Sequence, residues 1–178
     1  MSRTNFVLGA RRLLRVAVLV VAAGAHGPDR MHHPELVLEA LVGLGVDVAG
    51  ALSEPPIHWA IARDYRKLAI QFIDQGADVR LLYDSGTPLA RAAERGQHEV
   101  VARLLERKAD VDGGTTTGTT PLQFAVFDGR LETVELLLKH GANSKGIGAG
   151  VRAELEKSPD ADRRAIVELL QRHEALRP

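Results

Sequence analysis

The sequence predicts an all-α fold, a solenoid of stacked helix–turn–helix units, and three observations lead to this prediction. Blocks of sequence recur at a fixed spacing of 33 residues. Within each block, apolar residues follow the i, i+3, i+4 spacing of a helix with one buried face. Hydrophobic residues make up 45% of the chain but aromatic residues only 4%. We therefore expect a core of aliphatic side chains packed between short helices.

The recurring blocks align without a gap over residues 87–142. Thr87-Pro88-Leu89 returns as Thr120-Pro121-Leu122, and Leu104-Leu105 returns as Leu137-Leu138. A third, degenerate copy lies upstream, where Pro-Ile-His-Trp-Ala at 56–60 leads into Gly-Ala-Asp at 76–78. Copies at one period indicate a repeat array, in which each unit buries its apolar face against its neighbours.

Each unit carries its own start and stop signals. Thr87 and Thr120 are suited to cap a first helix, and the Pro that follows each of them fits the first helical position, where its missing N–H is not needed. Gly96 and Gly129 are expected to end that helix. The second helix then carries the buried stripe, which in one copy consists of Val134, Leu137 and Leu138.

These blocks resemble ankyrin repeats, whose pattern combines Thr-Pro-Leu-His, a Gly in mid-repeat and a terminal Leu-Leu-x-x-Gly-Ala-Asp. The match is specific over residues 87–111 and 120–143. The upstream copy keeps the histidine, as His58, but has Pro55 in place of Thr and Asp64 in place of the turn Gly. The resemblance implies an all-α ankyrin-repeat solenoid that serves as a protein–protein interaction scaffold. It also implies a structural hydrogen bond, not catalysis, for His58.

The predicted domain organisation follows this register. We expect ankyrin repeats at 55–86, 87–119 and 120–152, a degenerate N-terminal repeat at 26–54 and a C-terminal capping repeat at 153–178. In the cap, Gln171 stands where the preceding unit has Leu138, and a polar residue there suits a face that meets water. The glycine-rich stretch 146–150 has no phosphate-binding spacing and is predicted to be a loop.

Residues 1–25 have two interpretations. Four Arg and no acidic residue accompany the apolar run 16–21 and the small residues Ala23-Gly24-Ala25, a pattern typical of a secretory signal peptide. Ala22-Ala23-Gly24 also fits the end of a first helix in a degenerate repeat. The folded first helix, which is the interpretation we adopt, predicts a cytoplasmic protein. The signal peptide, cleaved near Ala25, goes with an exported protein that supports an enzyme or acts as an effector.

Composition argues against several classes of function. The chain has 23 basic and 23 acidic residues, so it has no net charge to attract nucleic acid or an anionic membrane. It has no cysteine, which excludes disulfides and thiolate chemistry. The densest group of metal-ligand types is His26, Asp29, His32 and His33, but adjacent histidines point in different directions, so we expect a loop there. We expect no enzyme, no catalytic, cofactor or metal site, no membrane span, and a monomer.

By the resemblance, partners bind at turn tips and at the exposed side of the first helices. One tip contains Leu81 and the next contains Thr115, Thr116 and Thr117. The predicted partner-binding residues are Arg63, Leu82, Tyr83, Asp84, Glu94, Arg95, Phe127 and Asp128. Tyr83 and Phe127 are the candidate anchors, because aromatic side chains beside charges are typical of binding hot spots. The alternative is that Phe127 packs on Phe124 and Tyr83 packs on its own turn; Trp59 and Phe124 are expected in the core.

Overall fold

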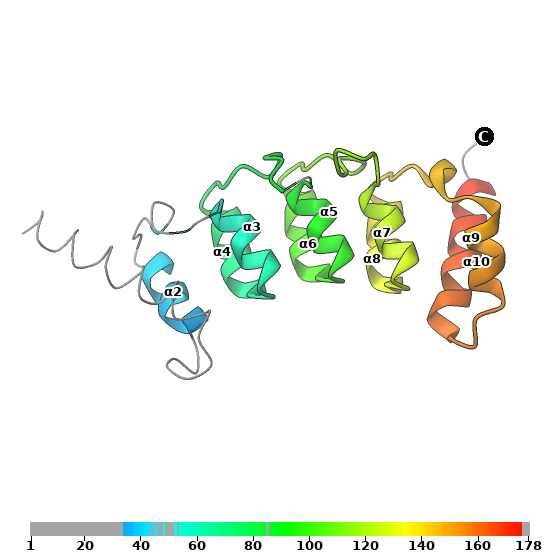
Figure 1. Cartoon of the computed structure of the whole chain (residues 1–178), viewed down its shortest axis with the longest axis horizontal. Coiled ribbons are helices and arrows are strands. Elements are labelled where there is room, and N and C mark those ends of the chain that lie inside the picture. Colours follow the sequence, from blue (N-terminus) through cyan, green and yellow to red (C-terminus); the bar gives the residue numbers. More distant parts are fainter. Residues whose placement is uncertain are drawn as a thin grey trace, which may run out of the picture. The chain divides into compact units, whose positions relative to one another are not determined.

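The computed structural model of the protein describes residues 34–43, 45, 48, 52, 54–84 and 86–175. Helices joined by turns and short loops make up these ranges, which confirms the all-α prediction (Figure 1). None of the described helices is long and apolar enough to cross a bilayer. The signal-peptide and metal-cluster interpretations concern residues 1–33, which lie outside the described residues. The chain forms two compact units, one up to Ala77 and one from Asp78 onward.

The N-terminal unit contains α2 (Pro34–Gly43), α3 (Pro56–Ala62) and α4 (Arg66–Asp74). α2 packs against α4, and its Leu38 and Val42 are fully buried. The side-chain Nε2 of Gln75 donates a hydrogen bond of 2.7 Å to the carbonyl oxygen of Val42. The same carbonyl accepts the Gly45 N–H at 2.9 Å, so the Gln75 side chain adds a second bond at the C-terminal end of α2. α2 thus packs beside the second helix of the helix pair that follows it.

The helix pair α3 and α4 departs from the repeat pattern at its turn. Asp64, which replaces the turn glycine, has φ of 60°. A non-glycine residue in this left-handed region costs roughly 1 kcal/mol or more, although Asp tolerates it better than most residues. Trp59 is 1% exposed, so its expected core position is confirmed.

The C-terminal unit opens with two matching helix pairs, α5 (Pro88–Glu94) with α6 (His98–Glu106), and α7 (Pro121–Phe127) with α8 (Leu131–Lys139). The predicted caps are confirmed: Thr87 Oγ1 accepts from the Ala90 N–H, and Thr120 forms a reciprocal capping box with Gln123. The turn glycines have φ of 64° and 67°, the geometry for which glycine was expected.

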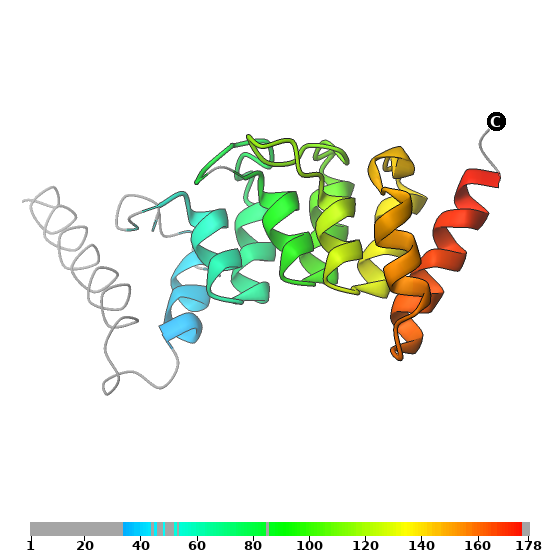
Figure 2. The same ribbon diagram turned by 45° about the vertical axis from the view of Figure 1, so that its right-hand side comes forward.

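The two pairs stack layer on layer. First helix α5 packs beside α7, and second helix α6 packs beside α8 (Figure 2). Leu104 of α6 and Leu137 of α8 are fully buried, as the apolar stripe predicted. Phe124 is only half-buried, so the expectation of a core position holds only in part. The first helices therefore form one layer of this unit, and the connecting loops rise from their N-terminal ends.

The unit ends with a short 3-10 turn, η2 (Ser144–Gly146), and two helices, α9 (Ala149–Glu156) and α10 (Ala161–Ala175). α10 packs on both α8 and α9, and Gln171 on it is exposed, as expected of a cap. Two expectations need correction here. The boundary predicted at 153 falls inside α9, and the end of the glycine-rich stretch predicted as a loop is helical. Gly150 is a poor helix former, but Leu155 in the same helix is 3% exposed, and its burial favours the helix.

An ion pair joins the two cap helices. Arg152 on α9 donates to Glu174 on α10 through Nη1 at 2.8 Å and through Nη2 at 2.5 Å. The Ser144 hydroxyl donates to the same carboxylate at 3.1 Å. The hydrogen bonds from Arg152 hold the pKa of Glu174 below its ordinary value, and they raise the pKa of Arg152.

Candidate functional site

The first loop tip of the C-terminal unit is a tight turn held by its own backbone. The Tyr83 N–H donates to the Gly86 carbonyl and the Gly86 N–H donates to the Tyr83 carbonyl, both at 3.1 Å. Asp84 at the bend has φ of 46°. In the next tip the Thr115 N–H donates to the Thr119 carbonyl at 3.0 Å. Both tips are therefore defined turns, which present their side chains from a fixed backbone.

Apolar side chains are exposed on the first of these tips. We define the tip cluster as Leu81, Leu82, Tyr83 and Asp84. The two leucines are 40% and 48% exposed, and Tyr83 is half-buried. The tip cluster thus offers adjacent apolar side chains to solvent. The second tip, with Thr116 and Thr117 exposed, is polar.

A second group lies where the first helices end. We define the helix-end cluster as Glu94, Arg95, Phe127 and Asp128. Glu94 and Phe127 are the last residues of α5 and α7, and Arg95 and Asp128 are the C-caps that follow them. Because α5 and α7 pack side by side, the two helix ends lie on the same side of the unit. The Phe127 side chain is 53% exposed, so about half of its surface is left for a partner.

The two clusters lie at opposite ends of the first-helix layer. The tip cluster precedes Thr87, the N-cap of α5, whereas Arg95 is the C-cap of the same helix. The seven residues of α5 correspond to a helix length of about 10 Å. A partner that contacts both clusters must therefore run along the helix layer. Tyr83, Arg95 and Phe127 therefore all lie in the C-terminal unit, but Tyr83 lies at one end of the first-helix layer and the other two lie at the opposite end.

Arg91 connects the tip cluster to the helix-end cluster. It is not among the partner-binding residues predicted from the sequence. Its Nη2 lies 3.1 Å from an Asp84 carboxylate oxygen and also donates to the Asp84 carbonyl. Its Nη1 lies 3.4 Å from a Glu94 carboxylate oxygen. Asp84 and Glu94, both predicted to bind a partner, are thus already paired inside the chain. In the sequence, the i, i+3 spacing of Arg91 and Glu94 indicates the second of these ion pairs, and no pattern indicates the first.

Arg63, the remaining predicted residue, is placed in the N-terminal unit. Its Nη1 forms an ion pair of 2.8 Å with Glu54, and its guanidinium lies over the Trp59 ring at 4.4 Å from the centroid. Half-buried ion pairing and a cation–π contact both stabilise the folded unit. Its ion pair and its ring contact are therefore both with residues of the N-terminal unit.

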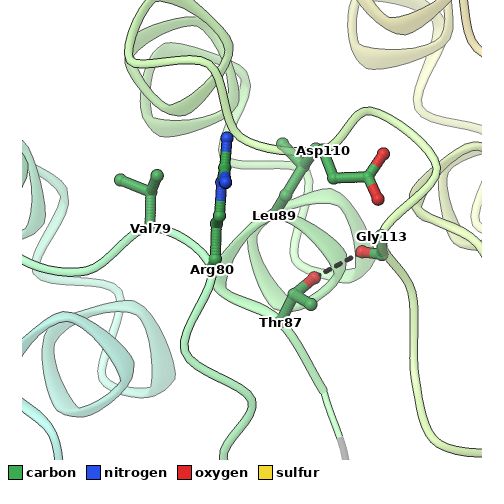
Figure 3. Close-up of a pocket in the computed structure, with 6 residues that line it drawn as sticks. All are labelled: Val79, Arg80, Thr87, Leu89, Asp110 and Gly113. Carbon is green, nitrogen blue, oxygen red and sulfur yellow. Dashed lines mark hydrogen bonds between the residues drawn. The ribbon is translucent and has the colours of Figure 1, made fainter.

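A small pocket lies between the two tips of the C-terminal unit (Figure 3). Its volume is about 150 Å³. The residues that line it are Val79, Arg80, Thr87, Leu89, Asp110 and Gly113. The described residues contain no group of three or more side chains suited to hold a metal ion.

Comparison with known proteins points to one family. A family model described as ankyrin repeats, three copies, matches residues 57–146, just over half of the chain. Ankyrin repeat protein nuc-2 of Neurospora crassa is 36% identical over 110 residues, which cover 60% of this chain and 10% of that protein. Ankyrin repeat and SOCS box protein 16 of Mus musculus is 39% identical over 106 residues, covering 53% and 23%. Serine/threonine-protein kinase 12 of Arabidopsis thaliana is 38% identical over 73 residues, covering 40% and 16%. The chain thus spans less than a quarter of the length of each of these relatives.

Proposed function

The chain belongs to the ankyrin-repeat family, and from that premise we propose that it is a protein-binding scaffold whose partner contacts the tip cluster and the helix-end cluster. Ankyrin repeats generally mediate protein–protein interaction and are generally non-catalytic. In such a stack the helix interfaces hold the repeats together, which leaves the tips and helix ends for a partner.

The observation that carries the proposal is where exposed apolar side chains occur. Among the described residues, the exposed large hydrophobic side chains are Leu36, Leu81, Leu82 and Phe127. Three of these four belong to the tip cluster or the helix-end cluster. Exposed apolar groups beside charges are the usual composition of an interface core.

Phe127 is the proposed anchor because of the area it leaves uncovered. A phenylalanine side chain buries on the order of 200 Å², and the Phe127 side chain is 53% exposed. Covering that remainder at about 25 cal/mol per Å² contributes roughly 2 to 3 kcal/mol, the size of a binding hot spot. Tyr83 is the second anchor, with less free surface.

Photo-crosslinking from defined positions tests the proposal. A benzophenone amino acid is placed at Phe127 or Leu82 in the full chain, expressed in the source cells, with Glu135 on the second helix α8 as the matched exposed control position. We expect one protein to be crosslinked from the first two positions and not from Glu135, and the purified protein to bind the unmodified chain. Crosslinking from Glu135 alone, or equal crosslinking from all three positions, would contradict the proposal.

A further inference from the structure

The pocket between the tips has the size of one side chain. An apolar cavity of about 150 Å³ holds a benzene molecule, whereas sites for drug-sized ligands and cofactors measure roughly 300 to 1,000 Å³. Val79 and the fully buried Leu89 are its apolar lining residues. A leucine-sized side chain from another molecule therefore matches this pocket, and a cofactor does not.

The two walls of the pocket are tied to each other. Thr87 Oγ1 donates a hydrogen bond of 2.5 Å to the Gly113 carbonyl, which is drawn as the dashed line in Figure 3. Gly86 also pairs with Thr115 in an isolated β-bridge between the tips. Because these bonds lie within the chain and tie the two tips together, filling the pocket requires little ordering of the chain, and less binding energy is lost to it.

Arg80 supplies the positive charge at this pocket, and Asp110 supplies a negative one. Its side chain is exposed, and its guanidinium has no hydrogen bond or ion pair within the part of the chain that the structure describes. The nearby acids are engaged: the Asp110 carboxylate accepts from the Asp112 N–H at 3.2 Å, and the Asp112 carboxylate accepts from the Asn143 N–H at 2.9 Å. In Figure 3, Arg80 and the Asp110 carboxylate lie on opposite sides of Leu89.

We propose that this tip pocket receives a leucine-sized apolar side chain from an extended segment of the partner protein, and that an aspartate or glutamate beside that side chain pairs with Arg80. The inference rests on the proposed scaffold function and specifies the chemistry of the partner segment. Adjacent to the pocket, Leu81 and Leu82 give the flanking residues of the same segment an apolar surface. The partner's recognition element is thus an apolar residue with an acidic residue beside it.

Three synthetic peptides test this inference on the intact chain. The first has the sequence acetyl-Ser-Asp-Leu-Asp-Ser-amide, the second replaces both Asp by Lys, and the third replaces Leu by Ala. Titrations are followed by the methyl NMR signals of Val79 and Leu89, which line the pocket. We expect the first peptide to shift both signals saturably, the lysine peptide to bind at least about twofold more weakly, and the alanine peptide at least about tenfold more weakly.

Variants of the protein complete the test. Arg80→Gln is expected to weaken the acidic peptide about two- to fivefold, the range for a solvent-exposed ion pair, and not to weaken the lysine peptide, because it removes a like charge. Val79→Phe should occupy the pocket and abolish the shift of the Leu89 methyls, with the melting temperature as the check that both variants fold. Lys139→Gln, on α8, is the matched control for loss of one exposed cation and should change nothing.

The outcomes separate the pocket from the wider binding surface. If the acidic peptide leaves the Val79 and Leu89 signals in place, or if the lysine peptide binds as well, the pocket inference is wrong. If the peptides behave as expected but crosslinking from Leu82 and Phe127 finds no partner, the pocket stands and the two-cluster interface is wrong.

Discussion

Thr87 joins two consecutive loop tips through one hydroxyl group. Its Oγ1 accepts the Ala90 N–H at the start of α5 and donates to the Gly113 carbonyl of the next tip at 2.5 Å. One side chain thus caps a helix and fixes the wall of the pocket. Thr120, the equivalent residue of the next repeat, caps α7 in a box with Gln123, whose Nε2 donates to the Gly146 carbonyl at 3.0 Å.

Replacing the Thr87 hydroxyl should therefore affect two bonds at once. Thr87→Val keeps the shape but loses the cap, worth about 1 kcal/mol, and the bond to Gly113, worth about 1 kcal/mol. We expect the free energy of unfolding to fall by roughly 2 kcal/mol in urea titrations. Thr87→Ser retains the hydroxyl and should lose well under half as much. Equal effects of the two substitutions would show that the hydroxyl is not the stabilising group.

The stacking of repeats is tested at Leu137. This side chain is fully buried on α8, which packs between α6 and α10. Leu137→Ala is expected to lower the free energy of unfolding by roughly 2 to 4 kcal/mol, because it leaves a cavity inside the stack. Thr116→Ala, at an exposed tip position, should change it by less than about 0.5 kcal/mol. Thermal melts in which both variants match the parent would refute the stacked-repeat description of this helix.

The cap ion pair predicts a dependence of stability on pH. The pKa of Glu174 is lowered from its ordinary 4.5 by the hydrogen bonds from Arg152. A carboxyl group whose pKa is lower in the folded than in the unfolded chain contributes its full share to the free energy of unfolding above about pH 4.5. This contribution is lost as the pH falls through the lowered pKa of the folded chain. Because the Glu174 side chain is 38% exposed, we expect the contribution to be about 1 kcal/mol or less.

Melting temperatures between pH 7 and pH 3 measure this contribution. Glu174→Gln should melt a few degrees below the parent at pH 7, and the difference should shrink below about pH 4.5. Glu168→Gln, an exposed change on the same helix, is the control and should follow the parent at every pH. A gap between Glu174→Gln and the parent that stays constant down to pH 3 would contradict the assigned role of the ion pair.

The repeat framework was predictable because its signals are local. The caps at Thr87 and Thr120, the turn glycines and the Leu137 stripe each follow from residues within one helix length, and the structure bears them out. The start of α9 was not predictable in this way. Gly150 within α9 argues against a helix, and burial of Leu155 against the rest of the unit outweighs that preference.

The candidate site was predictable only as a list of exposed positions. Exposure of Leu82 and Phe127 followed from the repeat register, but pairing of Arg91 with Asp84 joins residues of different local elements. The pocket beside Arg80 likewise depends on Gly113, which comes from the next repeat. Contacts between repeats depend on stacking geometry, which periodicity alone does not specify.

The dissociation constant of the purified partner for Phe127→Ala tests the central claim most directly. The partner is the protein crosslinked from Phe127, and affinities are measured by calorimetry for the parent, Phe127→Ala, Tyr83→Ala and the control Glu135→Ala. Truncation of a central aromatic anchor costs about 2 kcal/mol or more in binding. We expect the first two variants to bind at least about tenfold more weakly with unchanged melting temperatures, and Glu135→Ala to bind like the parent. Folded Phe127→Ala and Tyr83→Ala proteins that bind with the parent's affinity would contradict the claim that the tip cluster and the helix-end cluster form the interface.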